Sequence, residues 1–98
     1  MRQVVIRGTV QGVGFRYWAR RGATARGLQG WVRNRGRDSV EAVFAGPDRA
    51  VAEMIALCRR GPDAARVDTV DEEPADPDAL DLRKKDERFS ELSSIRPW

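Results

Sequence analysis

The sequence contains no histidine and only one cysteine, Cys58. Without histidine, the chain has no imidazole to act as a general base, to complete a Ser-His-Asp triad or to bind a metal ion. A single cysteine excludes an internal disulfide and every motif in which two thiolates share a metal ion or a redox reaction. These absences remove the commonest hydrolytic and redox machinery from consideration.

Long hydrophobic runs are also absent, because no apolar stretch approaches the roughly 18 residues that a membrane-spanning helix needs. The N-terminus leads directly into a strand-like segment without the apolar region of a signal peptide. The 98 residues provide for one modest hydrophobic core. We therefore expect a single domain over residues 1–98 that resides in the cytoplasm, has no membrane partner and acts as a monomer.

Acidic residues are nearly missing from the first part of the chain. Residues 1–40 contain nine arginines and one acid, Asp38, whereas residues 41–98 contain nine basic and fourteen acidic residues. The net charge of +3 is therefore the sum of a strongly basic half and an acidic half. Such a division indicates that the basic half binds an anion, or that the two halves attract each other in the folded protein.

The apolar residues alternate with a strand period in some segments and a helix period in others. Phe15, Trp18, Ala19, Gly22 and Ala23 share one helix face, and Val51, Met54, Ile55 and Cys58 share another. The order is β-α-β-β-α-β, which predicts an α/β (α+β) sandwich with two helices on one face of a four-stranded antiparallel sheet. We expect strands over residues 3–10, 28–34, 40–44 and 66–70, and helices over 15–26 and 48–60.

The C-terminal part is harder to assign from its pattern. Residues 72–81 contain five acids, two prolines and no basic residue, so we expect an exposed charged loop that extends over 72–88. A short last strand is expected over residues 89–92. The residues from Ser93 to Trp98 have no assigned role.

The most informative segment runs from Gly8 to Arg16, with the letters GTVQGVGFR. Glycines in a strand-to-helix turn allow successive backbone N–H groups to point into one concavity, which binds anions next to a helix N-terminus. Arg16 follows in the first helical turn and can bind two phosphate oxygens at once. The alternative is a turn that needs glycine for its geometry, with a solvated Arg16. The P-loop and dinucleotide patterns do not fit, because Phe15-Arg16 and Tyr17 occupy their required Lys-Ser/Thr and glycine positions.

A second segment makes a family resemblance clear. The letters VQGVGFR at 10–16, followed by GLQGWVRN at 27–34, resemble the acylphosphatase family over about residues 3–74. The resemblance implies a ferredoxin-like fold and the hydrolysis of the carboxyl–phosphate bond of acyl phosphates, with no metal and no cofactor. Its partners would be the acyl phosphate substrate and the inorganic phosphate product.

The resemblance also implies the site. Arg16 would bind the phosphate together with the backbone amides of residues 11–15, and Asn34 would hold the attacking water. The amides are those of Gln11, Gly12, Val13, Gly14 and Phe15. Asn34 could instead be a residue that ends a strand, because asparagine tolerates turn geometry. Arg33 should point to the sheet face opposite that of Asn34. Trp18 fits packing in the core, and Trp31 fits packing on the sheet face that the helices leave uncovered.

The absence of histidine agrees with this chemistry. An acyl phosphate releases a carboxylate, whose conjugate acid has a pKa of about 4, so that the leaving group needs no general acid. Two other interpretations remain. One is a non-catalytic module of the same fold that binds anions or nucleic acid, although we expect no nucleic-acid partner. The other is a domain like the N-terminal part of hydrogenase maturation carbamoyltransferases, which would need a zinc-binding region that this sequence does not contain.

Overall fold

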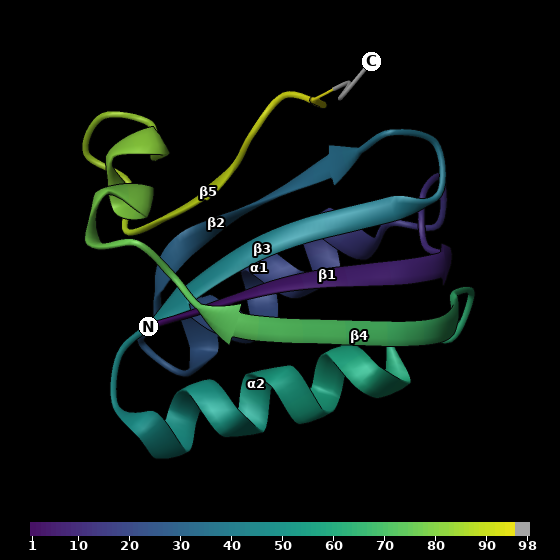
Figure 1. Cartoon of the computed structure of the whole chain (residues 1–98), viewed down its shortest axis with the longest axis horizontal. Helices are drawn as coiled ribbons and strands as arrows, with labels where there is room; N and C mark the ends of the chain where they lie inside the picture. Colours follow the sequence, from purple (N-terminus) through teal and green to yellow (C-terminus); the bar gives the residue numbers. More distant parts are fainter. Residues whose placement is uncertain (96–98) are drawn as a thin grey trace.

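The computed structural model describes residues 1–95, in which two helices and a sheet form two layers (Figure 1). Apart from one short 3-10 helix, the elements follow the expected order with boundaries that move by a few residues. In chain order they are β1 (Arg2–Thr9), α1 (Phe15–Ala25), β2 (Gln29–Arg35), β3 (Ser39–Ala45), α2 (Asp48–Arg60), β4 (Arg66–Pro74) and β5 (Phe89–Glu91). Trp98, left without a role above, lies outside the described residues.

The sheet has five strands in the order β4-β1-β3-β2-β5. The first four are antiparallel to their neighbours, and β5 adds to the edge of β2 as a parallel strand. Both helices lie on one face of this sheet (Figure 1). The predicted α+β sandwich and its short last strand are therefore confirmed. Within residues 1–95, no helix is long and apolar enough to cross a membrane.

The prediction of a loop over residues 72–81 is wrong, because a strand covers its start and a 3-10 helix covers most of the rest. Strand β4 continues to Pro74, because Glu72 and Glu73 pair with Val4 and Gln3 of β1. Their side chains are exposed, and an edge strand can carry charged residues while its backbone still pairs on one side. A 3-10 helix then covers Pro77–Leu82. Only residues 83–88 connect to β5 without a helix or strand.

This 3-10 helix lies against the sheet face that the two long helices leave open. The Trp31 Nε1–H donates a hydrogen bond of 2.7 Å to the carbonyl oxygen of Ala79, and Trp31 is only 2% exposed. Trp31 thus packs on the predicted face but is covered. Trp18, expected in the core, is only half-buried; its ring meets Phe15 edge-on at 5.2 Å.

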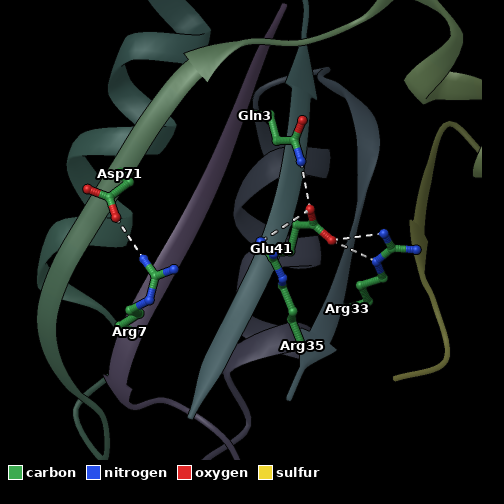
Figure 2. A network of polar contacts seen from close by, with 6 residues as sticks. All are labelled: Gln3, Arg7, Arg33, Arg35, Glu41 and Asp71. Atoms are coloured by element: carbon green, nitrogen blue, oxygen red, sulfur yellow. Dashed lines mark hydrogen bonds and ion pairs between the residues drawn. The ribbon is translucent and has the colours of Figure 1, made fainter. Parts of the chain in front are cut away.

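A buried carboxylate organises the open face of the sheet (Figure 2). Glu41 is 5% exposed and accepts a hydrogen bond of 2.6 Å from Gln3 Nε2. The Arg33 guanidinium contacts the same carboxylate through Nε and Nη2, both at 2.9 Å, and Arg35 Nη1 lies 4.0 Å away. Arg33 also stacks over the Trp31 ring at 4.6 Å. These contacts connect β1, β2 and β3 across the face opposite the helices.

Replacing Glu41 by alanine should lower the free energy of unfolding by about 3 kcal/mol, because Arg33 loses its buried partner. The exposed pair between Arg7 Nη1 and Asp71 Oδ2, at 2.7 Å, provides the control (Figure 2). Asp71→Ala should cost less than about 0.5 kcal/mol, since solvent screens a surface ion pair. Urea unfolding at pH 7 measures both values, and equal costs would contradict the assigned importance of Glu41.

The single cysteine completes the apolar face of α2. Burial raises the pKa of the Cys58 thiol to about 12. Because thiol reagents attack the thiolate, Cys58 should react at pH 8 only as fast as the protein opens. The folded state also holds this proton at higher pH than the unfolded chain, so the free energy of unfolding should fall as pH rises above about 9. Labelling with a chromogenic disulfide reagent, with and without urea, checks the first expectation. Rapid labelling of the folded protein would contradict it.

Candidate active site

The turn between β1 and α1 exposes backbone amides at a helix N-terminus. Gly12 has a φ of 74° and Gly14 a φ of 77°, conformations that other residues rarely adopt. Gly14 is the N-cap of α1, and it supplies no side-chain hydrogen bond. The first turn of α1 also contains no acidic residue. The first amides of α1 therefore keep both their hydrogen-bonding capacity and the positive end of the helix dipole for an anion.

A cleft of about 160 Å³ lies at this turn. Its walls bring together residues from the turn, from α1, from β2 and from β5. They are Val10, Gly12, Gly14, Phe15, Arg16, Tyr17, Asn34 and Glu91. Five of the seven residues that the sequence points to thus line one cleft, although Asn34 is far from the others in the chain.

The other two expected residues lie beside the cleft rather than in its lining. The Gln11 side chain points to the β2–β3 turn, where its Nε2 donates to the carbonyl oxygens of Ser39 at 2.8 Å and Gly36 at 3.1 Å. Val13 is half-buried and packs against the hydrophobic core. Gln11 therefore ties the glycine turn to the hairpin that carries Asn34. This contact could not be read from the sequence, because it joins two turns through one side chain.

Arg16 lies in the first turn of α1 and is half-buried. Its Nη1 donates a long hydrogen bond of 3.4 Å to the carbonyl oxygen of Leu92, just beyond β5. Among residues 1–95, no carboxylate forms an ion pair with Arg16. The guanidinium is thus held at the cleft while its charge is left for a ligand.

Asn34 lies on β2, opposite Val40 of β3. Its backbone is held on one side by β3 and on the other by Ile95, whose N–H donates a hydrogen bond of 2.9 Å to the Asn34 carbonyl oxygen. The side-chain amide makes no hydrogen bond within the described part of the chain, so its oxygen is available to a bound molecule. The neighbouring Arg33 points to the opposite face and binds Glu41, as the strand alternation predicts.

Glu91 is a cleft residue that the sequence did not indicate. It pairs with Arg20 Nε at 3.2 Å, one turn along α1 from Arg16. Its position depends on the parallel pairing of β5 with β2, in which Glu91 lies opposite Val32. A three-residue strand at the end of a charged segment gives little signal for such a pairing. In residues 1–95, no group of three Cys, Asp or Glu side chains could hold a metal ion.

Comparisons with known proteins identify the family. The acylphosphatase family model matches residues 2–89. A curated acylphosphatase of Nitrobacter hamburgensis is 57% identical over 95 residues, which are 97% of this chain and 96% of that protein. The crystal structure of acylphosphatase from Bacillus subtilis superposes with a TM-score of 0.75 and 31% identity, covering 93% of this chain and 96% of that one.

A longer protein contains the same fold as one of its parts. The crystal structure of HypF from T. kodakarensis matches 98% of this chain with a TM-score of 0.72 and 31% identity, but the match is only 12% of that protein. The curated relative, by contrast, has nearly the same length as the matched region. With the family model, the relative and the structures in agreement, the chain belongs to the acylphosphatase family.

Proposed function

We propose that this protein hydrolyses acyl phosphates to a carboxylate and inorganic phosphate without a metal ion. One observation carries the proposal: Arg16, Asn34 and the amide-rich glycine turn line a single small cleft in a chain of this family. The cleft volume of about 160 Å³ suits a phosphoryl group and a water molecule. The cleft contains a fixed positive charge, a helix N-terminus and a neutral amide, which together fit an anionic substrate.

In this proposal the phosphoryl group lies on the backbone amides of residues 11–15 and against the Arg16 guanidinium. The Asn34 amide oxygen accepts a hydrogen bond from the attacking water. The water oxygen forms a bond to phosphorus while the bond between phosphorus and the acyl oxygen breaks. The electron pair of the broken bond stays on that oxygen, which leaves as part of the carboxylate. The proton of the water passes to a phosphate oxygen. Phosphoryl transfer asks the protein mainly for positioning and charge stabilisation, which these groups provide.

Glu91 adds a negative charge to the cleft in which the phosphoryl group would bind. A carboxylate in the cleft would repel a phosphoryl group, but the ion pair with Arg20 partly neutralises it. The pair also brings β5 against α1 next to Arg16. We therefore assign Glu91 to the wall of the cleft and leave proton transfer to the phosphate itself.

The alternative is a non-catalytic module that binds nucleic acid or another anion. Single-stranded RNA is commonly bound by aromatic rings exposed on a sheet of this kind. The aromatic residue available for this, Trp31, is instead buried beneath the 3-10 helix and hydrogen-bonded to Ala79. This observation favours the small-molecule substrate. A monomeric state and residence in the cytoplasm stay predictions from the sequence.

Hydrolysis of benzoyl phosphate in EDTA tests the proposal. The expected result is turnover at a rate that EDTA leaves unchanged, with inorganic phosphate as a competitive inhibitor. Activity that disappears in EDTA and returns with a divalent cation would overturn the metal-free mechanism. The absence of any turnover, together with retained phosphate binding, would favour the non-catalytic module.

A further inference from the structure

A larger groove lies between the two helices, next to the cleft. It has a volume of about 410 Å³ and is lined by Tyr17, Trp18, Arg21, Gly22, Arg26 and Leu57. Gly22 brings the helices close, because a Cβ at this position would lie 3.1 Å from the Met54 Cε of α2. The half-buried Trp18 and Leu57 give the groove an apolar wall, and the two arginines add positive charge to its lining. The phosphate chemistry proposed above uses none of these six residues.

Tyr17 connects the groove to the cleft, because it is the residue that lines both. It follows Arg16 directly and is 53% exposed, with the Arg20 and Arg21 guanidinium groups 5.9 and 5.7 Å from its ring centre. One turn of α1 advances about 5.4 Å. A substrate whose phosphate lies at the start of α1 would therefore pass Tyr17 and meet Arg21 about one turn further on.

The volumes of the two sites match the two parts of an acyl phosphate. The cleft of about 160 Å³ has no room for a large acyl group beside a phosphate and a water. Sites that hold small organic molecules usually measure about 300 to 1,000 Å³ and are mostly apolar with a few polar groups. The groove falls within this range and has that composition.

The charges at the far part of the groove are only partly neutralised. Within residues 1–95, Arg21 forms no ion pair with a carboxylate. Arg26 Nη1 donates to the Gly22 carbonyl oxygen at 3.0 Å, but its Nε is buried without a hydrogen-bond partner and lies 3.8 Å from Glu53 Oε2. Because Arg26 is partly neutralised by Glu53, an anionic group at this end would depend mainly on the exposed Arg21 guanidinium.

We propose that the groove binds the acyl group of the substrate, and that it favours an acyl group with an apolar, preferably aromatic, body and a negatively charged far end. This inference rests on the proposed function, since it assigns the acyl side of the same substrate. Binding energy from the acyl body then helps to hold the phosphoryl group against Arg16 and Asn34. Tyr17 is the point at which the two parts of the substrate meet.

Three substrates whose acyl groups extend progressively further into the groove test the proposal on the full chain. They are acetyl, benzoyl and 4-carboxybenzoyl phosphate. For the native protein we expect kcat/KM to rise in that order, by about tenfold at the first step, since even one methylene in an apolar pocket changes specificity by about tenfold or more. Leu57→Trp, which fills the groove, should lower kcat/KM for benzoyl phosphate about tenfold. The same variant should leave kcat/KM for acetyl phosphate within about twofold of the native value. Ala56→Trp places the same side chain at an exposed neighbouring position of α2 and should change neither.

Arg21→Gln tests the charged end. It should remove the preference for 4-carboxybenzoyl over benzoyl phosphate, whereas Arg49→Gln, at a 93% exposed side chain of α2, should preserve it. Tyr17→Ser, at an exposed position, should reduce the benzoyl-to-acetyl ratio even if Leu57→Trp fails to fold. Equal losses for acetyl and benzoyl phosphate in the Leu57 and Tyr17 variants would overturn the groove assignment. A native protein that hydrolyses none of the three substrates would instead contradict the proposed function.

Discussion

Asn34→Ala is expected to abolish turnover of acyl phosphates while inorganic phosphate still binds. We expect kcat to fall about 10³-fold, the upper range for losing one positioned polar group in an active site. The inhibition constant of phosphate should stay within about threefold, because the glycine turn and Arg16 are unchanged. The fold should be retained, since the Asn34 side chain makes no hydrogen bond within residues 1–95. Steady-state kinetics with phosphate as inhibitor measure both quantities.

Asn34→Asp provides the matched comparison. The carboxylate keeps an oxygen that could orient water but adds a negative charge to the cleft, so it should weaken phosphate binding as well as turnover. If Asn34→Ala kept near-native kcat, the assignment of the water to Asn34 would be wrong. If it lost phosphate binding to the same extent as turnover, Asn34 would be a phosphate ligand instead.

Arg16→Ala is expected to lose both phosphate binding and turnover. The side chain is the charged group of the cleft that no carboxylate among residues 1–95 neutralises, and it would contact the phosphoryl group in both the ground state and the transition state. We expect kcat/KM to fall by at least about 10⁴-fold, as when a charge clamp on a transferred phosphoryl group is removed. Phosphate at millimolar concentration should no longer inhibit any residual activity. Kinetics and phosphate titration by calorimetry measure the two effects.

Arg20→Ala is the control for net charge on the same helix. Arg20 pairs with Glu91 at 3.2 Å but is not part of the cleft lining. Its loss should raise KM several-fold and weaken the dependence of KM on salt, with kcat within about twofold, because it removes positive charge that attracts the substrate and leaves Glu91 without its partner. Equal losses in the Arg16 and Arg20 variants would show that the cleft needs only positive charge and not a guanidinium at position 16.

The parts of the structure that the sequence predicted are those in which local pattern and packing agree. The periods of the apolar residues predicted both helices, and the glycine turn and Arg16 lie at a helix N-terminus as expected, while anion binding there stays a prediction. In β4 the pattern was misleading, because Glu72 and Glu73 are exposed at a sheet edge and their pairing with β1 depends on backbone hydrogen bonds. Charged side chains at such a position look like a loop.

The features that the sequence could not predict all depend on contacts between distant segments. Glu91 reaches the cleft only because β5 pairs with β2 in parallel, and Gln11 acts through the turn that follows β2. Gly22 lines the groove between the helices, but in the sequence it looks like an ordinary small residue of a helix face. Trp31 was expected on the open face, but its cover over residues 77–82 was not expected.

The most direct test of the account is the position of the water oxygen in the products. Hydrolysis of benzoyl phosphate in water enriched in oxygen-18, under conditions of single turnover, should place the label in inorganic phosphate and leave benzoate unlabelled. This result follows if water held by Asn34 attacks phosphorus on the glycine turn and Arg16. Label in benzoate would mean that water attacks the carbonyl carbon, and it would contradict the proposed mechanism.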